Sequence, residues 1–124
     1  MSYFIYRCSS YTYNECIRRN LFGQKENMRN FVKEVRPGDI LFLHNLSERF
    51  IEGPFEALTD SNGTLEPVAW NGDFPLQVRV RRLPEYRRIT CDEAVNLGLN
   101  YTYENRFFDF KIPDDIGRIL AENI

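Results

Sequence analysis

The sequence is poor in metal-binding side chains. It has 1 histidine and 3 cysteines (Cys8, Cys16 and Cys91), and no two cysteines form a CxxC pair. A structural zinc site uses four Cys or His ligands at short spacings, so we expect no metal. Because disulfides are rare in reducing compartments, an odd set of cysteines favours free thiols in an intracellular, cytoplasmic protein.

Long apolar runs and catalytic motifs are also missing. No hydrophobic stretch approaches the roughly 18 residues of a membrane span, and the first residues carry no charged leader, so we expect neither membrane nor signal segment. There is no P-loop, GxGxxG, GxSxG or HExxH motif. Cys8 or Cys16 could pair with His44 as a nucleophile, but no neighbouring residue would activate the thiol. These absences predict a binding domain without cofactors rather than an enzyme; any catalysis would lie in another domain.

The charges are nearly balanced. There are 16 basic and 18 acidic residues, a net charge of -2, so no overall basic field argues for nucleic acid. Apolar residues make up 43% and aromatic residues 15% of the 124 residues, enough for one domain with a substantial core. No feature signals an oligomer.

The chain is organised around a turn followed by two strands. Residues 36–39, Arg-Pro-Gly-Asp, have strong turn chemistry because proline presets one backbone angle and glycine permits a positive φ. Residues 40–43 form an uninterrupted apolar run, as in a strand buried on both faces. Gly53 and Pro54 then open a second strand.

The remaining pattern mixes strands and helices. A first strand is expected at residues 3–8, followed by a helix that Thr12 and Glu15 begin as a capping box and that ends near Phe22 and Gly23. Further expected elements are a weak helix at 24–35, strands at 76–83 and 106–110, a helix capped by Thr90 and Glu93, and a last helix opened by Pro113. This order predicts an α+β fold, a small mixed β-barrel flanked by helices.

Three clusters could bind a ligand, and each has a structural alternative. Phe22, Trp70 and Phe74 would either fill the core or form an aromatic slot for a flat or methylated group. Ser9, Ser10 and Asn14 would either cap the first helix or contact a ligand at its start. The third cluster is basic and would either protect a solvated sheet edge or bind phosphates; it comprises Arg79, Arg81, Arg82, Arg87 and Arg88.

Several motifs, in the order in which they occur along the chain, resemble a known domain family. They are Asn-Leu-Phe-Gly at 20–23, the stretch 35–43, Gly-Pro-Phe-Glu-Ala at 53–57, Leu-Glu-Pro-Val-Ala-Trp at 65–70 and residues 74–80. Together they resemble the DCD domain pattern and are similar to YTH and EVE domains, all of the PUA-like superfamily. The similarity runs from about residue 3 to residue 90 and implies a small β-barrel flanked by helices.

The resemblance implies a reader of N6-methyladenine, whose base is flipped into an aromatic cage. Phe22 and Trp70 fall on cage positions, and the backbone carbonyl of Gly23 would accept from the methylated amino group. The polar stretch that contacts the base edge corresponds to Cys8, Ser9 and Ser10, and a basic pair to Arg81 and Arg82. The chain departs from YTH domains with phenylalanine in place of the first cage tryptophan and Ser-Ser in place of Asn-Asn. The third wall is unassigned, with Phe74 and Leu65 as candidates.

We therefore interpret residues 1–124 as one PUA-like domain that binds DNA or RNA carrying a methylated base. It would be the N-terminal module of a longer protein, such as the DNA-recognition domain of a modification-dependent restriction system with a nuclease or NTPase as further domain or partner. Two alternatives stay open. One is a protein-interaction module of DCD type, and the other is a binder or hydrolase of a nucleotide-like small molecule.

Overall fold

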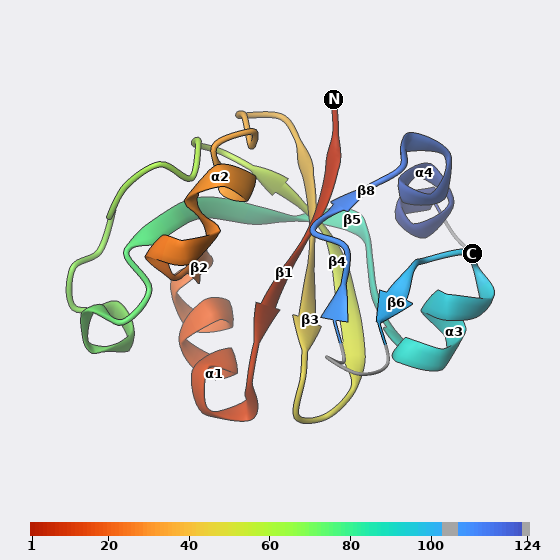
Figure 1. Ribbon diagram of the computed structural model, residues 1–124, viewed down its shortest axis with the longest axis horizontal. Helices are drawn as coiled ribbons and strands as arrows, with labels where there is room; N and C mark the ends of the chain where they lie inside the picture. Colours follow the sequence, from red (N-terminus) through yellow and green to blue (C-terminus); the bar gives the residue numbers. More distant parts are fainter. Residues whose placement is uncertain (103–106, 123–124) are drawn as a thin grey trace.

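The computed structural model describes residues 1–102 and 107–122. Its centre is a curled mixed sheet with the strand order β2-β5-β4-β3-β1-β8 (Figure 1). These strands are β1 (Tyr3–Cys8), β2 (Leu21–Gln24), β3 (Ile40–Asn45), β4 (Phe50–Ala57), β5 (Leu76–Thr90) and β8 (Lys111–Ile112). β1 and β3 are parallel and the other neighbours antiparallel. The predicted α+β fold with a small, partly closed mixed barrel is confirmed.

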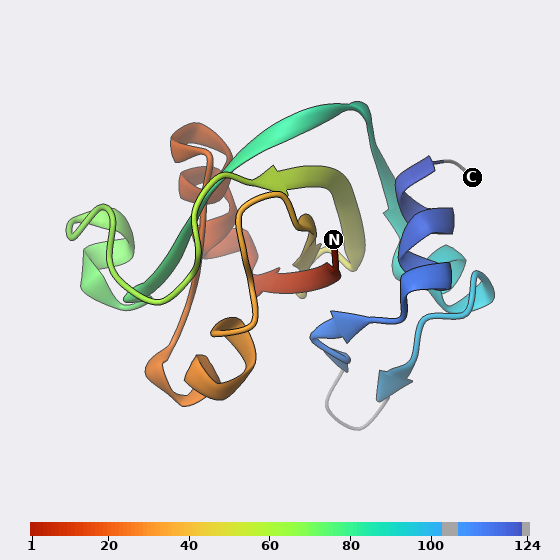
Figure 2. The same cartoon turned by 90° about the horizontal axis from the view of Figure 1, so that it is seen from above.

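Helices cover both faces of the sheet (Figure 2). On one side lie α1 (Ser10–Arg19), the 3-10 turn η1 (Glu26–Met28) and α2 (Arg29–Val32). On the other side lie α3 (Cys91–Asn96) and α4 (Asp114–Glu122), with the strand pair β6 (Tyr101–Thr102) and β7 (Phe107–Phe108). A second 3-10 turn, η2 (Ala69–Gly72), lies in the long connection between β4 and β5.

Alternate residues of the central strands fill two separate cores. In β3, Leu41 and Leu43 pack into the core beneath α1, whereas Ile40 and Phe42 pack into the core shared with α3 and α4. The uninterrupted apolar run is therefore explained, because both faces of this strand are buried as predicted. Each large side chain buried in this way contributes roughly 1.5–3 kcal/mol to folding.

The start and end of α1 differ from the sequence prediction. Ser9, not Thr12, is the N-cap, and Thr12 completes the capping box, because the chain leaves β1 directly into the helix. The helix ends at Arg19, and Asn20 takes the left-handed conformation (φ 51°) expected at Gly23. The next residues continue as β2, an edge strand that pairs with β5.

Four other elements differ in length from their predictions. The weak helix is reduced to η1 and α2, β5 runs on to Thr90, and β4 begins at Phe50 rather than at Gly53 because the residues before Gly53 already pair with β3 and β5. The late strand is limited to β7; Arg106 lies outside the described residues. The capping box of Thr90 and Glu93 is confirmed, and the last helix, α4, begins one residue after Pro113. None of the helices in the described part of the chain has both the length and the apolar character that a membrane crossing requires.

Candidate functional site

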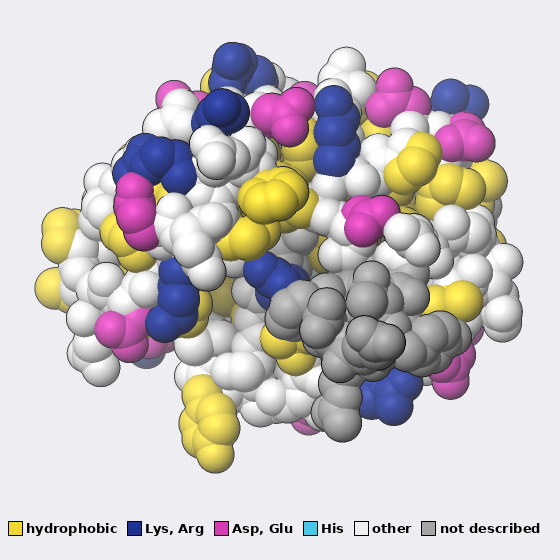
Figure 3. Space-filling model, in the orientation of Figure 1, with side chains coloured by type: hydrophobic (Ala, Val, Ile, Leu, Met, Phe, Trp, Pro, Cys, Tyr) yellow, Lys and Arg dark blue, Asp and Glu magenta, His cyan; other side chains and the backbone are white. Residues whose placement is uncertain are grey.

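A pocket of about 340 Å³ opens where β1 runs into α1. One wall comes from the end of β1 and the start of α1, and the opposite wall from the end of β2 and from η1. Its lining residues are Arg7, Cys8, Ser9, Thr12, Gln24, Lys25, Asn27, Met28, Leu46 and Phe74. Figure 3 shows that hydrophobic and basic side chains border a hollow near the centre of this face.

The hydroxyl groups at the pocket are used in the helix cap. Ser9 Oγ accepts from the backbone N–H of Tyr11 at 3.2 Å, and Thr12 Oγ1 accepts from that of Ser9 at 3.0 Å. Thr12 Oγ1 also lies 3.3 Å from the carbonyl oxygen of Ser9. The capping alternative therefore applies to Ser9, which still lines the pocket. Ser10 and Asn14 are exposed on α1 and are not among the lining residues.

Trp70 is a buried structural residue rather than a wall of this pocket. Its side chain is 5% exposed, and its indole Nε1 donates to the carbonyl oxygen of Thr12 at 3.1 Å. A Cβ atom at Gly23 would lie only 2.8 Å from Trp70 Cζ3, so the indole packs directly on the glycine backbone. Trp70 contacts Phe74 edge-on, with ring centroids 5.6 Å apart. Phe74 thus provides the aromatic face of the pocket, and Trp70 supports it from behind.

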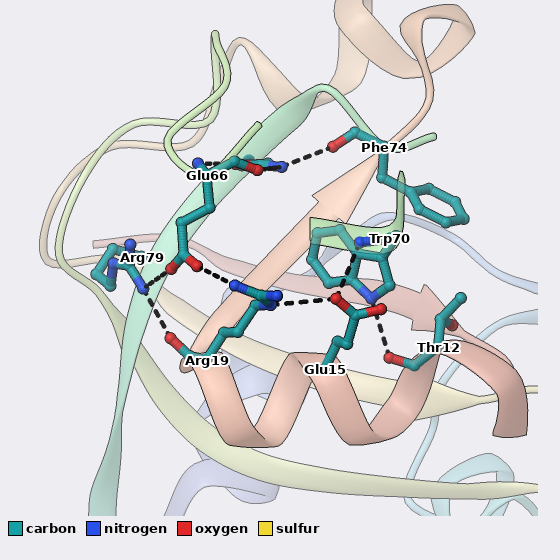
Figure 4. Close-up of polar contacts among 8 residues, drawn as sticks. Thr12, Glu15, Arg19, Glu66, Trp70, Phe74 and Arg79 are labelled. Atoms are coloured by element: carbon teal, nitrogen blue, oxygen red, sulfur yellow. Dashed lines mark hydrogen bonds and ion pairs between the residues drawn. The ribbon is translucent and has the colours of Figure 1, made fainter. Parts of the chain in front are cut away.

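The connection that carries these two rings is fixed by one buried glutamine and by partly exposed ion pairs (Figure 4). Gln77 is 1% exposed; its Oε1 accepts from the backbone of Leu65 and Glu66, each at 2.7 Å, and its Nε2 donates to Phe74 O at 3.2 Å. Glu66 pairs with Arg79 at 2.7 Å and with Arg19 at 2.5 Å. These bonds fix the position of Phe74, which follows the short 3-10 turn η2.

Hydrogen bonds at this connection lower the pKa of two carboxyl groups, those of Glu66 and Glu15. Hydrogen bonds from Arg79 and Arg19 lower the pKa of Glu66. The backbone N–H of Trp70, 3.0 Å from Glu15 Oε1, lowers the pKa of Glu15. Both groups are therefore ionised at neutral pH and hold the connection to α1 and β5.

The expectation that Phe22 forms a stacking wall does not hold in this structure. Its ring is fully buried in the core against Tyr6 and Phe55, with centroids 5.7 and 4.9 Å away. Phe22 lies opposite Val78 in the β2–β5 ladder, and both side chains belong to the core beneath α1. Gly23 lies under Trp70, and Leu65 is exposed outside the lining.

The arginines of β5 all have partners within the domain. Arg79 pairs with Glu66, Arg81 with Glu56 at 2.5 Å and Arg88 with the fully buried Glu52 at 3.0 Å. Arg82 stacks on Tyr86, 4.3 Å from the ring centroid, and Arg87 donates to the backbone oxygen of Leu120 at 3.0 Å. Phosphate binding by these side chains would have to compete with these contacts.

His44 does not approach the cysteines named as its candidate partners. Its Nε2 lies 3.4 Å from Cys91 Sγ in the second core, and both side chains are buried. Burial lowers the pKa of His44 to about 4 and raises the pKa of the Cys91 thiol, so the pair is neutral at pH 7. A neutral, inaccessible thiol is not a nucleophile. Within residues 1–102 and 107–122, no group of three His, Cys, Asp or Glu side chains could hold a metal ion.

No sequence pattern marks most of the second pocket wall. Gln24, Lys25, Asn27 and Met28 line it because β2 and η1 replace the expected weak helix. Arg7 and Thr12 belong to elements that were predicted, but no motif marks them as pocket residues. Cys8, Ser9 and Phe74 are the named candidates that the structure brings together.

Residues 2–119 match the family model of the development and cell death domain. The chain belongs to this family. The DCD domain is 36% identical over 84 residues to the B2 protein of Daucus carota, covering 62% of this chain and 41% of that protein. It is 36% identical over 96 residues to the DCD domain-containing protein NRP-B of Glycine max, covering 72% of this chain and 28% of that protein. The chain thus matches less than half the length of these curated relatives.

The fold is also that of a YTH domain. The crystal structure of the Pho92 YTH domain in complex with m6A superposes with a TM-score of 0.66, covering 94% of this DCD domain and 79% of that chain. The sequence identity is 16%, so the likeness establishes the shared PUA-like fold.

Proposed function

We propose that this DCD domain binds a single base of a nucleic acid, taken out of its strand, in the pocket between β1, α1 and η1. The observation that carries the proposal is the combination of one aromatic face, Phe74, with polar groups of Ser9 and Gln24 around about 340 Å³. Stacking on an aromatic ring contributes roughly 1–3 kcal/mol per base. Extruding a base costs a few kcal/mol, which favours single strands.

N6-methyladenine is the base that we favour. The structural neighbour was solved in complex with m6A, and Met28 and Leu46 add apolar surface to the pocket that a methyl group would contact. One buried methyl group adds about 0.8 kcal/mol, so selectivity for the mark would be modest. DNA and RNA present the same base, and both belong in the test.

Lys25 is the side chain that we propose for the flanking phosphate. It is exposed at the pocket rim, and its Nζ lies 5.4 Å from the centroid of Phe74. The β5 arginines would reach phosphates only by exchanging their present partners. Because few phosphates would be neutralised, affinity should fall less steeply with salt than for a protein with a basic groove.

A protein-interaction module is the second candidate. The paired arginines of β5 and the net charge of -2 leave no strong attraction for a polyanion. Exposed apolar side chains also lie within the connection between β4 and β5, with Leu58 44%, Leu65 43% and Val68 72% exposed. A protein partner would use this surface rather than the pocket.

Fluorescence polarisation with matched oligonucleotides tests the proposal. Plain and N6-methyladenine strands, of DNA and RNA, single and duplex, are titrated with wild type, Phe74→Ala and Ile119→Ala. Ile119 is 44% exposed on α4, away from the pocket, and serves as the control. We expect the methylated single strand to bind best and Phe74→Ala to bind about 5- to 100-fold more weakly. No binding at low salt would overturn the proposal and favour a protein partner.

A further inference from the structure

Gln24 is the unusual residue of the pocket wall. It ends β2, lines the pocket and is 5% exposed. Its amide nitrogen Nε2 is buried, and no acceptor for it is present among the described residues. Gln77, just as deeply buried, has its amide nitrogen bonded to the backbone oxygens of Glu66 and Phe74 at 3.1 and 3.2 Å. The fold therefore satisfies one buried glutamine and leaves the other with an unused donor.

An unused buried donor is unfavourable in the free protein, because the amide loses water and gains no partner. An apolar side chain of the same size would fill the space at Gln24 without this cost. The other deep polar groups of the pocket are already engaged, since Ser9 and Thr12 use their hydroxyls in the cap of α1. Gln24 is thus a buried amide in the pocket wall with an unused donor, and its side chain would have to turn to present that nitrogen to a ligand.

We propose that Gln24 determines specificity in this pocket, by donating a hydrogen bond from its side-chain amide to a ring nitrogen of a bound purine. The inference rests on the proposed function and adds the ligand class, an adenine-type purine, whose ring nitrogens N1, N3 and N7 are all unprotonated acceptors. A glutamine amide is well suited to adenine, which offers an acceptor beside a donor on its edge. A methyl group on N6 leaves all three acceptors, N1, N3 and N7, in place.

Deaza analogues test this contact atom by atom. Single strands carrying N6-methyladenine, or its 1-deaza, 3-deaza or 7-deaza form, are titrated with wild type, Gln24→Met, Gln24→Glu and Asn14→Ala. Methionine removes the donor at similar volume, glutamate replaces it by an acceptor, and Asn14 is an exposed amide on α1 that does not line the pocket. For wild type we expect one deaza form to bind about 3- to 10-fold more weakly, as the loss of one hydrogen bond predicts. That penalty should vanish in both Gln24 variants and persist in Asn14→Ala.

The outcomes separate the two proposals. If wild type binds the methylated strand but no deaza form weakens binding, or the penalty is unchanged in Gln24→Met, the role of Gln24 is overturned and the proposed function stands. If wild type binds no strand, the proposed function fails and the role of Gln24 fails with it. Trp70 fluorescence during denaturation shows which variants are folded, and the wild-type series alone can overturn the contact.

Discussion

Trp70 holds Phe74 at the pocket from behind. A tryptophan in a proline-flanked connection could equally fill the core or face a ligand, and the sequence pattern does not distinguish them. The distinction comes from long-range contacts, namely the bond to the Thr12 carbonyl and the packing on Gly23. Phe74, a candidate for the third wall, becomes the aromatic face of the pocket because Trp70 packs against it.

Gly23→Ala tests this support. The added Cβ would lie 2.8 Å from Trp70 Cζ3 and 2.9 Å from Phe74 Cβ, so both rings must move. We expect a loss of about 1–3 kcal/mol in the free energy of unfolding, as in other overpacked sites. Urea denaturation followed by fluorescence measures it. Gly63→Ala is the matched control, because no atom lies within 4 Å of its added Cβ. Equal stability of the two variants would contradict the packing of Trp70 on Gly23.

His44 makes a separate prediction for pH. Burial lowers its pKa from 6.5 to about 4, so the unfolded chain takes up a proton in this range that the folded domain does not. Stability should therefore be complete above pH 6.5 and fall as the pH drops toward 4, by up to about 3 kcal/mol for a shift of this size. Thermal melts of wild type and His44→Gln measure it. The same slope between pH 6.5 and 5 in both proteins would show that His44 is not responsible.

At the scale of elements, Glu15, Glu66 and Gln77 hold the connection between β4 and β5 against α1 and β5. The pKa values of both glutamates are lowered, so their contribution is complete above the ordinary value of 4.5 and is lost as the pH falls below it. We expect the emission of Trp70, the only tryptophan, to shift to the red below pH 4.5 before global unfolding. Glu66→Gln should show a red shift already at pH 7. Emission that changes only with the far-ultraviolet circular dichroism would refute a separate loosening of this connection.

Local signals in the sequence located the strong elements and failed where neighbouring contacts decide. The strand at 3–8, the buried run at 40–43 and the cap at Thr90 carry patterns that need no tertiary context. The residues after Asn20 carry no such pattern, because they form β2 by pairing with β5 instead of forming a helix. That one difference places Phe22 in the core and Gln24 in the pocket wall.

For the whole molecule, the ordered motifs were sufficient to predict the fold family, because they correspond to the turns and buried strands of the central sheet. The arginine-rich strand was less informative. Charge counted along the chain could not reveal that Arg81 lies opposite Glu56 and Arg88 opposite Glu52 across the β4–β5 ladder. The cluster that suggested a phosphate surface is largely paired within the domain, and the candidate site is the pocket lined by Cys8, Ser9, Gln24 and Phe74.

The most direct test of a base-binding pocket is to map the bound surface by NMR. Isotope-labelled domain is titrated at low salt with a single strand carrying N6-methyladenine, and the backbone and side-chain amide shifts are followed. We expect shifts concentrated at Ser9, Thr12, Gln24, Lys25 and Phe74, with the Gln24 side-chain amide among the largest. Shifts confined to the arginines of β5, or none at all while the same strand is present in excess, would contradict a base-binding pocket in this DCD domain.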